Sequence, residues 1–274
     1  MCGVFYVLFP CRATITAMKL VSWNVNGIRA VARKGALQEV MSALSPDILL
    51  IQETKAREDQ LSDEIRLLPG YKAYFNAHTE KGGYSGTAIY TKRDKPHKVE
   101  YGMGVAHLDT EGRMVTVRYE DLTVVNIYFP NGGQGPERLA YKLDFYEHFL
   151  AYVEALRRNG PVIWGGDVNT AHEEIDLARP RENVENTGFL PEERAWLDEV
   201  VQAGWIDSFR HLHPAKEGAY TYWDMKTRAR ERNVGWRIDY LFVSPDLLPN
   251  LKRASIHDTL LGSDHCPISV DVSL

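Results

Sequence analysis

The sequence predicts a layered α/β fold built around mixed β-sheets. Three observations support this fold class. Short apolar runs rich in β-branched and aromatic residues recur along the chain, segments with helical spacing lie between them, and two adjacent runs within residues 113–130 have the spacing of a hairpin. Because strands alternate with helices and some neighbouring strands also pair directly, we expect both parallel and antiparallel strands.

Eight segments are predicted to be strands. Several of them, such as DILLIQE at 47–53, are continuous apolar runs, which is typical of strands covered on both faces. The predicted strands span residues 19–23, 47–53, 86–92, 113–119, 122–130, 161–167, 237–244 and 267–274.

Three further segments are predicted to be helices. Residues 36–44 carry apolar side chains at helical spacing. Residues 142–160 end with two arginines and Gly160, and residues 191–204 begin with proline and acids and end with glycine. These are the residues that helix ends favour, since acids suit the positive N-terminal end and glycine suits the turn after the last residue.

The composition allows one large domain and limits its role. The chain has 274 residues, 44% of them hydrophobic, and no repeat or linker divides it, so we expect a single domain from 18 to 274. A net charge of −5 argues against a protein that coats nucleic acid by charge alone, although an enzyme with a local basic face fits. The three cysteines form no zinc pattern, so we expect free thiols in a reducing compartment.

The first 17 residues are expected to lie outside this domain, as a disordered or disposable extension. The apolar run at 4–9 is far shorter than the roughly 20 residues that a membrane-spanning helix needs. No positive charge precedes the run, as a signal peptide would require. The small residues of ATITA at 13–17 keep secretion as the less favoured alternative.

Polar residues gather where the predicted strands begin or end. The residues in these positions are Asn24, Asn26, Glu53, Tyr128, Asn131, Asp167, Asn169, Asp239, Asp264 and His265. A buried carboxylate without a partner costs several kcal/mol, so a group of acids at strand ends indicates a shared cation or shared hydrogen-bond donors.

Each of these residues also has a simpler structural explanation. The asparagines before Gly27 could shape a turn, Asp167 could cap a helix, and Glu53 could begin the exposed charge run ETKARED. Tyr128 could pack in the core, and a lone His265 would more often be structural. Asp239 is harder to explain in this way, because an acid between Ile238 and Tyr240 needs a partner. The functional interpretation therefore depends on the whole set.

The chemistry that suits this set is metal-assisted phosphodiester hydrolysis. Mg²⁺ prefers oxygen ligands and keeps several waters, so Glu53 and the amide oxygen of Asn26 would suffice to hold it. Tyr128, Asn169 and His265 could then neutralise charge on the phosphate. Asp167 could take a proton from the attacking water, while Asp239 holds the imidazole in one tautomer.

The chain resembles the exonuclease III family of abasic-site endonucleases, within the endonuclease/exonuclease/phosphatase superfamily. The resemblance extends from about Met18 to the C-terminus and rests on the motifs SWNVNGIRA, QETK, GYSG, YFPNGG, GGDVNTAH, NVGWRIDY and LGSDHCPI. It implies a four-layered α/β sandwich with two packed mixed β-sheets flanked by helices. It also implies Mg²⁺ as the cofactor, with Mn²⁺ as a possible substitute.

The resemblance assigns roles to the strand-end residues. Glu53 matches the main metal ligand, Asp264 matches a neighbouring carboxylate assigned as a further metal contact, and Asn26 stands near the metal where many relatives have Asp. The catalytic positions are Tyr128 at the phosphate, Asp167 and Asn169 at the nucleophile, and the coupled pair Asp239 and His265. Which group is the general base stays open at this point.

The resemblance also implies a DNA-binding surface. Residues near the DNA backbone or the metal segment are Asn24, Arg29, Lys55, Gly83, Tyr84 and Asn131. Tyr222, Trp236 and Ile238 match a small pocket for a flipped-out abasic sugar. Gln134 replaces an inserting arginine and Lys226 an apolar wedge, so an altered DNA grip is expected. The basic segment Lys226, Arg228, Arg230 and Arg232 is expected to meet phosphates, with a solvated loop as the alternative.

The implied function is incision of DNA on the 5′ side of an abasic site, with trimming of blocked 3′ ends and possible 3′→5′ exonuclease activity. The implied partner of the monomeric chain is duplex DNA rather than a membrane, in the bacterial nucleoid or the eukaryotic nucleus. One alternative is a phosphoinositide or sphingomyelin phosphodiesterase of the same superfamily, which would lack NVGWRIDY. Another is an inactive DNA-binding relative, against which the complete set of catalytic residue types argues.

Overall fold

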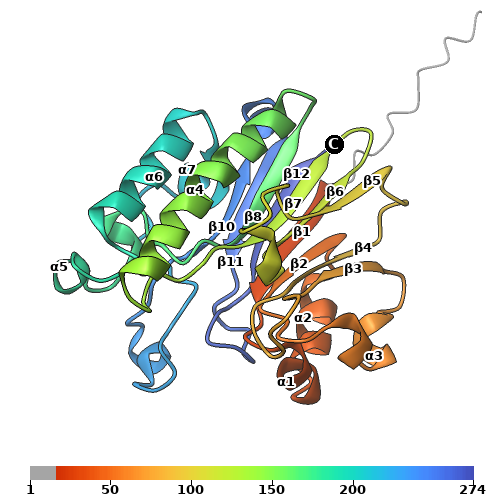
Figure 1. Ribbon diagram of the computed structural model, residues 1–274, viewed down its shortest axis with the longest axis horizontal. Helices are drawn as coiled ribbons and strands as arrows, with labels where there is room; N and C mark the ends of the chain where they lie inside the picture. The colour runs from red at the N-terminus through yellow and green to blue at the C-terminus, as the bar shows by residue number, and fades with distance from the viewer. Residues whose placement is uncertain (1–16) are drawn as a thin grey trace, which may run out of the picture.

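The computed structural model describes residues 17–274, and its core is two six-stranded mixed β-sheets packed face to face (Figure 1). The first sheet has the strand order β11 (Leu251–Ile256), β12 (Ile268–Ser273), β1 (Ala17–Asn24), β2 (Ile48–Gln52), β4 (Thr87–Thr91) and β3 (Lys72–Asn76). The second sheet has the order β5 (Lys98–Tyr101), β6 (Met114–Arg118), β7 (Thr123–Tyr128), β8 (Val162–Asp167), β10 (Asp239–Val243) and β9 (Ile206–Asp207).

Helices cover the outer face of each sheet and complete four layers (Figure 1). The helices α1 (Ile28–Arg33), α2 (Ala36–Leu44) and α3 (Asp63–Arg66) lie on the first sheet, and α4 (Pro136–Arg157) and α6 (Pro191–Gln202) lie on the second. Shorter helices are α5 (Pro180–Asn183) and α7 (Ser208–Leu212). Apolar side chains such as Leu50, Val124 and Leu241 fill the space between the sheets. The predicted four-layered α/β sandwich is confirmed.

The strand directions bring both halves of the chain to one edge. β1 runs parallel to β2 and β7 runs parallel to β8, so their carboxyl ends lie at the same end of the molecule. β10 is antiparallel to β8, which places its first residue, Asp239, opposite Asp167. The register also sets Tyr128 beside Asp167. Polar residues far apart in the sequence therefore meet at this edge.

Buried amides lock the two sheets together near that edge. The Gln52 Nε2 donates to Asn126 Oδ1 at 2.7 Å and to Ser22 Oγ at 3.0 Å. The Asn126 Nδ2 in turn donates to carbonyl oxygens of β2 and β4. Close approach also explains Gly166, which has φ +145° and whose added Cβ would lie 1.8 Å from the Ile127 carbonyl oxygen. Since a buried polar network is stable only when its partners align, it fixes how the sheets face each other.

The strands that were not predicted from the sequence all lie at sheet edges. All eight predicted strands are present, but β3, β5, β9 and β11 were not predicted. These four are the outermost strands of the two sheets. An edge strand pairs on one side only and carries exposed polar residues, so its sequence lacks the continuous apolar run of a central strand. The short helices α1, α3, α5 and α7 were also not predicted, and α4 begins at Pro136 rather than at 142 because proline suits the first turn of a helix.

The extension predicted at residues 1–17 lies almost wholly outside the described residues, as do Cys2 and Cys11. Cys266 is buried and has a free thiol, as predicted. Among the helices of residues 17–274, none combines the length and the apolar character needed to cross a membrane.

Candidate active site

The edge where the strands converge contains a cavity of about 410 Å³. Its lining residues are Glu53, Tyr128, Asn131, Asp167, Asn169, Thr187, Gly188, Tyr222, Asp224, Trp236, Ile238, Asp264 and His265. Larger surface hollows exist, including one of about 790 Å³ lined by the charged residues of 92–97 and 119–121. Only the smaller cavity among these brings acids, amides and an imidazole together, so we take it as the candidate site.

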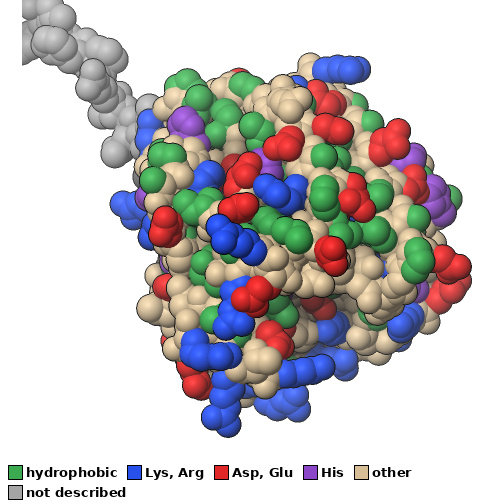
Figure 2. Space-filling view, turned by 90° about the vertical axis from the view of Figure 1, so that its left-hand side faces the viewer, with side chains coloured by type: hydrophobic (Ala, Val, Ile, Leu, Met, Phe, Trp, Pro, Cys, Tyr) green, Lys and Arg blue, Asp and Glu red, His purple; other side chains and the backbone are tan. Residues whose placement is uncertain are grey.

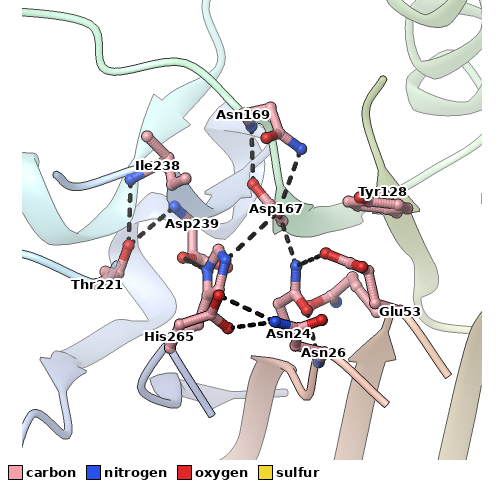
Figure 3. Close-up of polar contacts among 12 residues, drawn as sticks. Asn24, Asn26, Glu53, Tyr128, Asp167, Asn169, Thr221, Ile238, Asp239 and His265 are labelled. Carbon is pink, nitrogen blue, oxygen red and sulfur yellow. Dashed lines mark hydrogen bonds and ion pairs between the residues drawn. The ribbon is translucent and has the colours of Figure 1, made fainter. Parts of the chain in front are cut away.

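Asn24 lies beneath the cavity and joins two of its carboxylates (Figure 3). Its Nδ2 donates to Glu53 Oε1 at 3.0 Å and to Asp167 Oδ2 at 2.8 Å, and its Oδ1 accepts from the Asn26 amide at 2.9 Å. The side chain is fully buried. Its amide is therefore engaged in holding acids from both sheets, and the contact of Asn24 with the substrate stays a prediction.

Asp167 is held as a hydrogen-bond acceptor in a nearly dry position. The Asn169 backbone amide donates to its Oδ1 at 2.8 Å, and the Asn169 Nδ2 donates to its Oδ2 at 3.2 Å. Burial raises the pKa of Asp167 to about 7, with Asp239 and Glu53 acting in the same direction and His265 opposing them. A carboxylate with this pKa can both accept and release a proton near neutral pH.

Asp239 and His265 form the predicted acid–imidazole pair (Figure 3). The His265 Nδ1 lies 2.8 Å from Asp239 Oδ2, and its Nε2 lies 3.9 Å from Asp167 Oδ2. Burial alone would lower the pKa of His265, but the two acids outweigh it and raise the pKa to about 10. The ring is therefore an imidazolium at neutral pH, with a positive charge to offer to an anion.

Tyr128 presents a neutral hydroxyl to the same cavity. Burial, reinforced by the Glu53 charge, raises the pKa of its phenol well above the ordinary value. The buried Arg113 guanidinium lies 4.6 Å from the centre of the Tyr128 ring and donates to its carbonyl oxygen at 3.0 Å. The hydroxyl stays protonated and can donate to an oxygen anion.

Oxygen atoms of Glu53 and Asn26 contact the Lys55 ammonium, which shows that this part of the site can hold a cation. The Lys55 ammonium lies 2.8 Å from Glu53 Oε2 and also donates to Asn26 Oδ1. The Asn26 Nδ2 donates to both oxygens of Asp264, each at 3.0 Å. Hard oxygen donors grouped around a cation fit a divalent ion such as Mg²⁺ or Mn²⁺.

A second group of potential ligands lies deeper in the site. One ligand atom from each of Asp167, Asp239 and His265 lies within 4.8 Å of the others. The imidazole nitrogen nearest to Asp239 is already hydrogen-bonded, and the ring is positively charged, whereas a metal needs a neutral imidazole. We therefore favour the oxygen atoms around Glu53 as the metal-binding side.

An aromatic wall closes the other side of the cavity. Tyr222 and Trp236 are paired backbone to backbone, and the Tyr222 ring lies 4.9 Å from the His265 ring. Phe189 and Ile238 pack behind them. The pocket predicted from the sequence included Tyr222, Trp236 and Ile238. It did not include Thr187, Gly188 and Asp224, which also line the cavity. The motif NTGF at 186–189 was visible in the sequence, but nothing in it shows that this loop turns towards β8.

The remaining predicted contacts lie around the cavity rather than in it. Arg29 and Lys55 line a neighbouring hollow of about 570 Å³. Gln134 and Lys226 are exposed, and the Tyr84 hydroxyl accepts hydrogen bonds from Arg113 and Arg138.

The basic segment 226–232 makes contacts within the protein. Arg230 donates to the carbonyl oxygens of Asp258, Leu260 and Ser263, so it holds the loop before His265. Arg232 donates to the Thr227 carbonyl oxygen. Arg230 is thus engaged within the protein, while the side chains of Lys226 and Arg228 are exposed, and the phosphate contacts of this segment stay a prediction.

Comparison with known proteins defines the class. The model of the Endonuclease/Exonuclease/phosphatase family matches residues 21–265, and the chain belongs to this family. The chain is therefore an enzyme, a nuclease of this metal-dependent family.

Three similar proteins narrow the comparison. The chain is 43% identical to an exodeoxyribonuclease of Bacillus subtilis, over 94% of this chain and 100% of that protein. It is 43% identical to the DNA repair nuclease APEX1 of Danio rerio, over 92% of this chain and 81% of that protein. The crystal structure of the AP endonuclease LMAP from Leishmania major matches with a TM-score of 0.86 at 30% identity, over 98% of this chain and 93% of that one.

The Asn26→Asp variant should bind a divalent metal more tightly. The new carboxylate would join Glu53 and Asp264 around the cation. It would lose the hydrogen bonds that the Asn26 side-chain amide donates to Asp264. We expect Mn²⁺ affinity, measured by titration calorimetry, to rise about tenfold, which is about 1.4 kcal/mol for one added charge. Asn131→Asp adds the same charge at a cavity-lining position that contacts Asn169 rather than Glu53, and serves as the control. Equal affinity in Asn26→Asp and wild type would show that residue 26 does not contact the metal.

Proposed function

We propose that this nuclease acts in DNA repair, hydrolysing the phosphodiester on the 5′ side of an abasic site to leave a 3′-hydroxyl. The observation that carries the proposal is the small aromatic wall of Tyr222, Trp236 and Ile238 directly beside the Asp167 and His265 pair. A sugar without a base is cheap to flip out of a duplex and would fit this space, whereas a normal nucleotide is larger. The similar proteins of known name act as exodeoxyribonuclease, DNA repair nuclease and AP endonuclease.

The proposed metal is Mg²⁺, with Mn²⁺ as a substitute. Glu53, Asn26 and Asp264 would hold it, since oxygens of Glu53 and Asn26 contact the Lys55 ammonium and the Asp264 carboxylate lies against the Asn26 side chain. When bound, the ion neutralises charge on the phosphate oxygens. Release of the Lys55 ammonium from Glu53 would leave that side chain free to meet a DNA phosphate, which agrees with its predicted role.

The residues around the phosphate divide the remaining work. In this mechanism Asp167 takes the proton of the attacking water as the new P–O bond forms, and Asn169 fixes the carboxylate through two hydrogen bonds. The imidazolium of His265, held by Asp239, donates to a phosphate oxygen, and the Tyr128 hydroxyl donates to another. The P–O3′ bond then breaks, and the departing O3′ takes a proton from a solvent water to become the 3′-hydroxyl. This division makes Asp167 the general base, because His265 already carries its proton.

The charge distribution supports nucleic acid as the substrate. Lys and Arg side chains gather at the lower end in Figure 2, the same end to which β1 and β2 run in Figure 1. We propose that residues 18–274 act as one monomeric catalytic domain, because strands from both halves of the chain build the single cavity. The compartment would be that of the genome, either nucleoid or nucleus.

A comparison of substrates tests the proposal. We expect Mg²⁺-dependent incision of a duplex with one abasic site to be faster than removal of a 3′-phosphate or digestion of a recessed 3′ end. The physical reason is that an abasic sugar can enter the space beside the aromatic wall without a base having to be unstacked. Initial rates on the three DNA substrates and on a phosphoinositide ester, with and without Mg²⁺, decide the outcome. Turnover of the lipid ester without DNA cleavage would refute the assignment.

Asp167→Asn and His265→Ala should each slow incision by about 10²–10⁴-fold while leaving DNA binding nearly unchanged. The first variant removes the base, and the second removes the positive charge that Asp239 holds in place. Single-turnover rates and a fluorescence binding assay on abasic duplex measure the two effects. Near-normal turnover by either variant would exclude its assigned role, and His211→Ala provides a control at a histidine outside the cavity.

The rate should rise with pH because Asp167 must be ionised to accept a proton. With a pKa of about 7, kcat/KM should fall about tenfold for each pH unit below neutrality, and a bound cation would move the midpoint lower by favouring the carboxylate. The rising limb should be absent in Asp167→Asn. A wild-type profile that falls between pH 6 and 8 would contradict the assignment of Asp167 as the base.

A further inference from the structure

A buried ion pair behind the cavity is not used in the proposed mechanism. Lys142 on α4 and Glu193 on α6 are both completely buried, and the Lys142 Nζ lies 2.6 Å from Glu193 Oε1. Burial lowers the pKa of Lys142, while Glu193 and Asp167 act to keep it charged. A buried pair of this kind is a poor source of net stability, since removing two charges from water costs about as much as their attraction returns. Stability alone therefore does not explain why this ion pair lies behind the cavity.

The lysine side of the pair holds the loop that carries Asn169. Besides Glu193, the ammonium donates to the Asn169 carbonyl oxygen at 2.8 Å and to Thr170 Oγ1 at 2.9 Å, so all three of its hydrogens are used. Asn169 has φ +54°, in the left-handed region. A cation on its carbonyl oxygen fixes this unusual backbone, and with it the side chain that donates to Asp167.

The glutamate side of the pair holds the opposite wall of the cavity. Glu193 Oε1 accepts from Thr187 Oγ1 at 2.8 Å, while its Oε2 accepts from the backbone amides of Gly188 and Leu190. Thr187 and Gly188 both line the cavity, and Gly188 packs near Trp236. The carboxylate thus accepts four hydrogen bonds and keeps this loop at the aromatic wall.

Resting on the proposed function, we propose that Lys142 and Glu193 are positioning residues that couple the sugar-binding wall to the nucleophile side of the site. Neither touches the cavity itself, but their ion pair ties residues 169–170 to residues 187–190, in addition to the backbone hydrogen bond from the Ala171 amide to the Gly188 carbonyl oxygen. A substrate that seats against Thr187 and Gly188 would thereby be held in fixed register with Asn169 and Asp167. This geometric coupling, rather than stability, would then be the function of the pair.

The experiment compares Lys142→Met with the double variant Lys142→Met/Glu193→Gln, in which no unpaired buried charge remains. The single variant should lose thermal stability because it leaves Glu193 without its partner. The double variant should regain much of that stability but keep a kcat on abasic duplex lowered about tenfold or more, with KM changed less than about threefold, because reacting groups displaced by a fraction of an ångström lose rate. Lys142→Arg, which restores the charge, should recover part of kcat.

Val153→Ala on the same helix is the matched control, since it lowers stability at a buried position outside the site. A second readout does not depend on the substrate: amide hydrogen exchange should accelerate at residues 168–171 and 186–190 in the double variant and not in Val153→Ala. A folded double variant with wild-type kcat and unchanged exchange in both loops would overturn the proposal. If wild type fails to incise abasic DNA, the proposed function fails, while the exchange data still decide whether the pair positions these loops.

Discussion

The site depends on keeping Glu53, Asp167 and Asp239 together at one edge of two packed sheets. Asp167 and Asp239 are almost completely buried, so their mutual repulsion is only weakly screened. The protein compensates with one amide and one imidazole. Asn24 donates to Glu53 and Asp167, and His265 lies between Asp239 and Asp167. The Lys55 ammonium beside Glu53 and the two hydrogen bonds from Asn169 to Asp167 complete the compensation.

This compensation leaves the site with perturbed acidity. Asp167 has a pKa near neutrality and His265 a pKa of about 10, so an acceptor and a donor of protons coexist at neutral pH. The same shifts affect stability. Between pH 4 and 7 the unfolded chain releases the Asp167 proton before the folded one does, and above about 6.5 it also releases the His265 proton first. Both groups therefore make the fold less stable as the pH rises, which is a cost of the catalytic arrangement.

Rigid support from buried polar contacts makes this arrangement possible. Gln52 and Asn126 align the sheets. Arg237, which stands between Trp236 and Ile238 in the sequence, forms ion pairs with Asp176 at 2.8 Å and with Asp207 at 2.7 Å. Burial raises the pKa of Asp176, but Arg237 and Arg210 outweigh it and hold this pKa at about 2. The Arg237–Asp176 ion pair therefore persists over the whole neutral range. Lys142 and Glu193 continue the same pattern behind Asn169 and the 187–190 loop. These buried polar contacts hold segments next to the cavity and restrict how its loops can move.

The sequence by itself determined the central strands, the fold class and the chemical types at the strand ends. Central strands are readable because both faces are buried, which demands apolar residues at every position, and an acid such as Asp239 within such a run stands out. The edge strands were not readable, since their structure depends on a neighbour far away in the chain. Tertiary structure alone decided that Asn24 is internal, that Arg230 holds a loop, and that Lys142 meets Glu193. Burial and pairing arise from segments brought together only by folding, so neither can be inferred from local sequence.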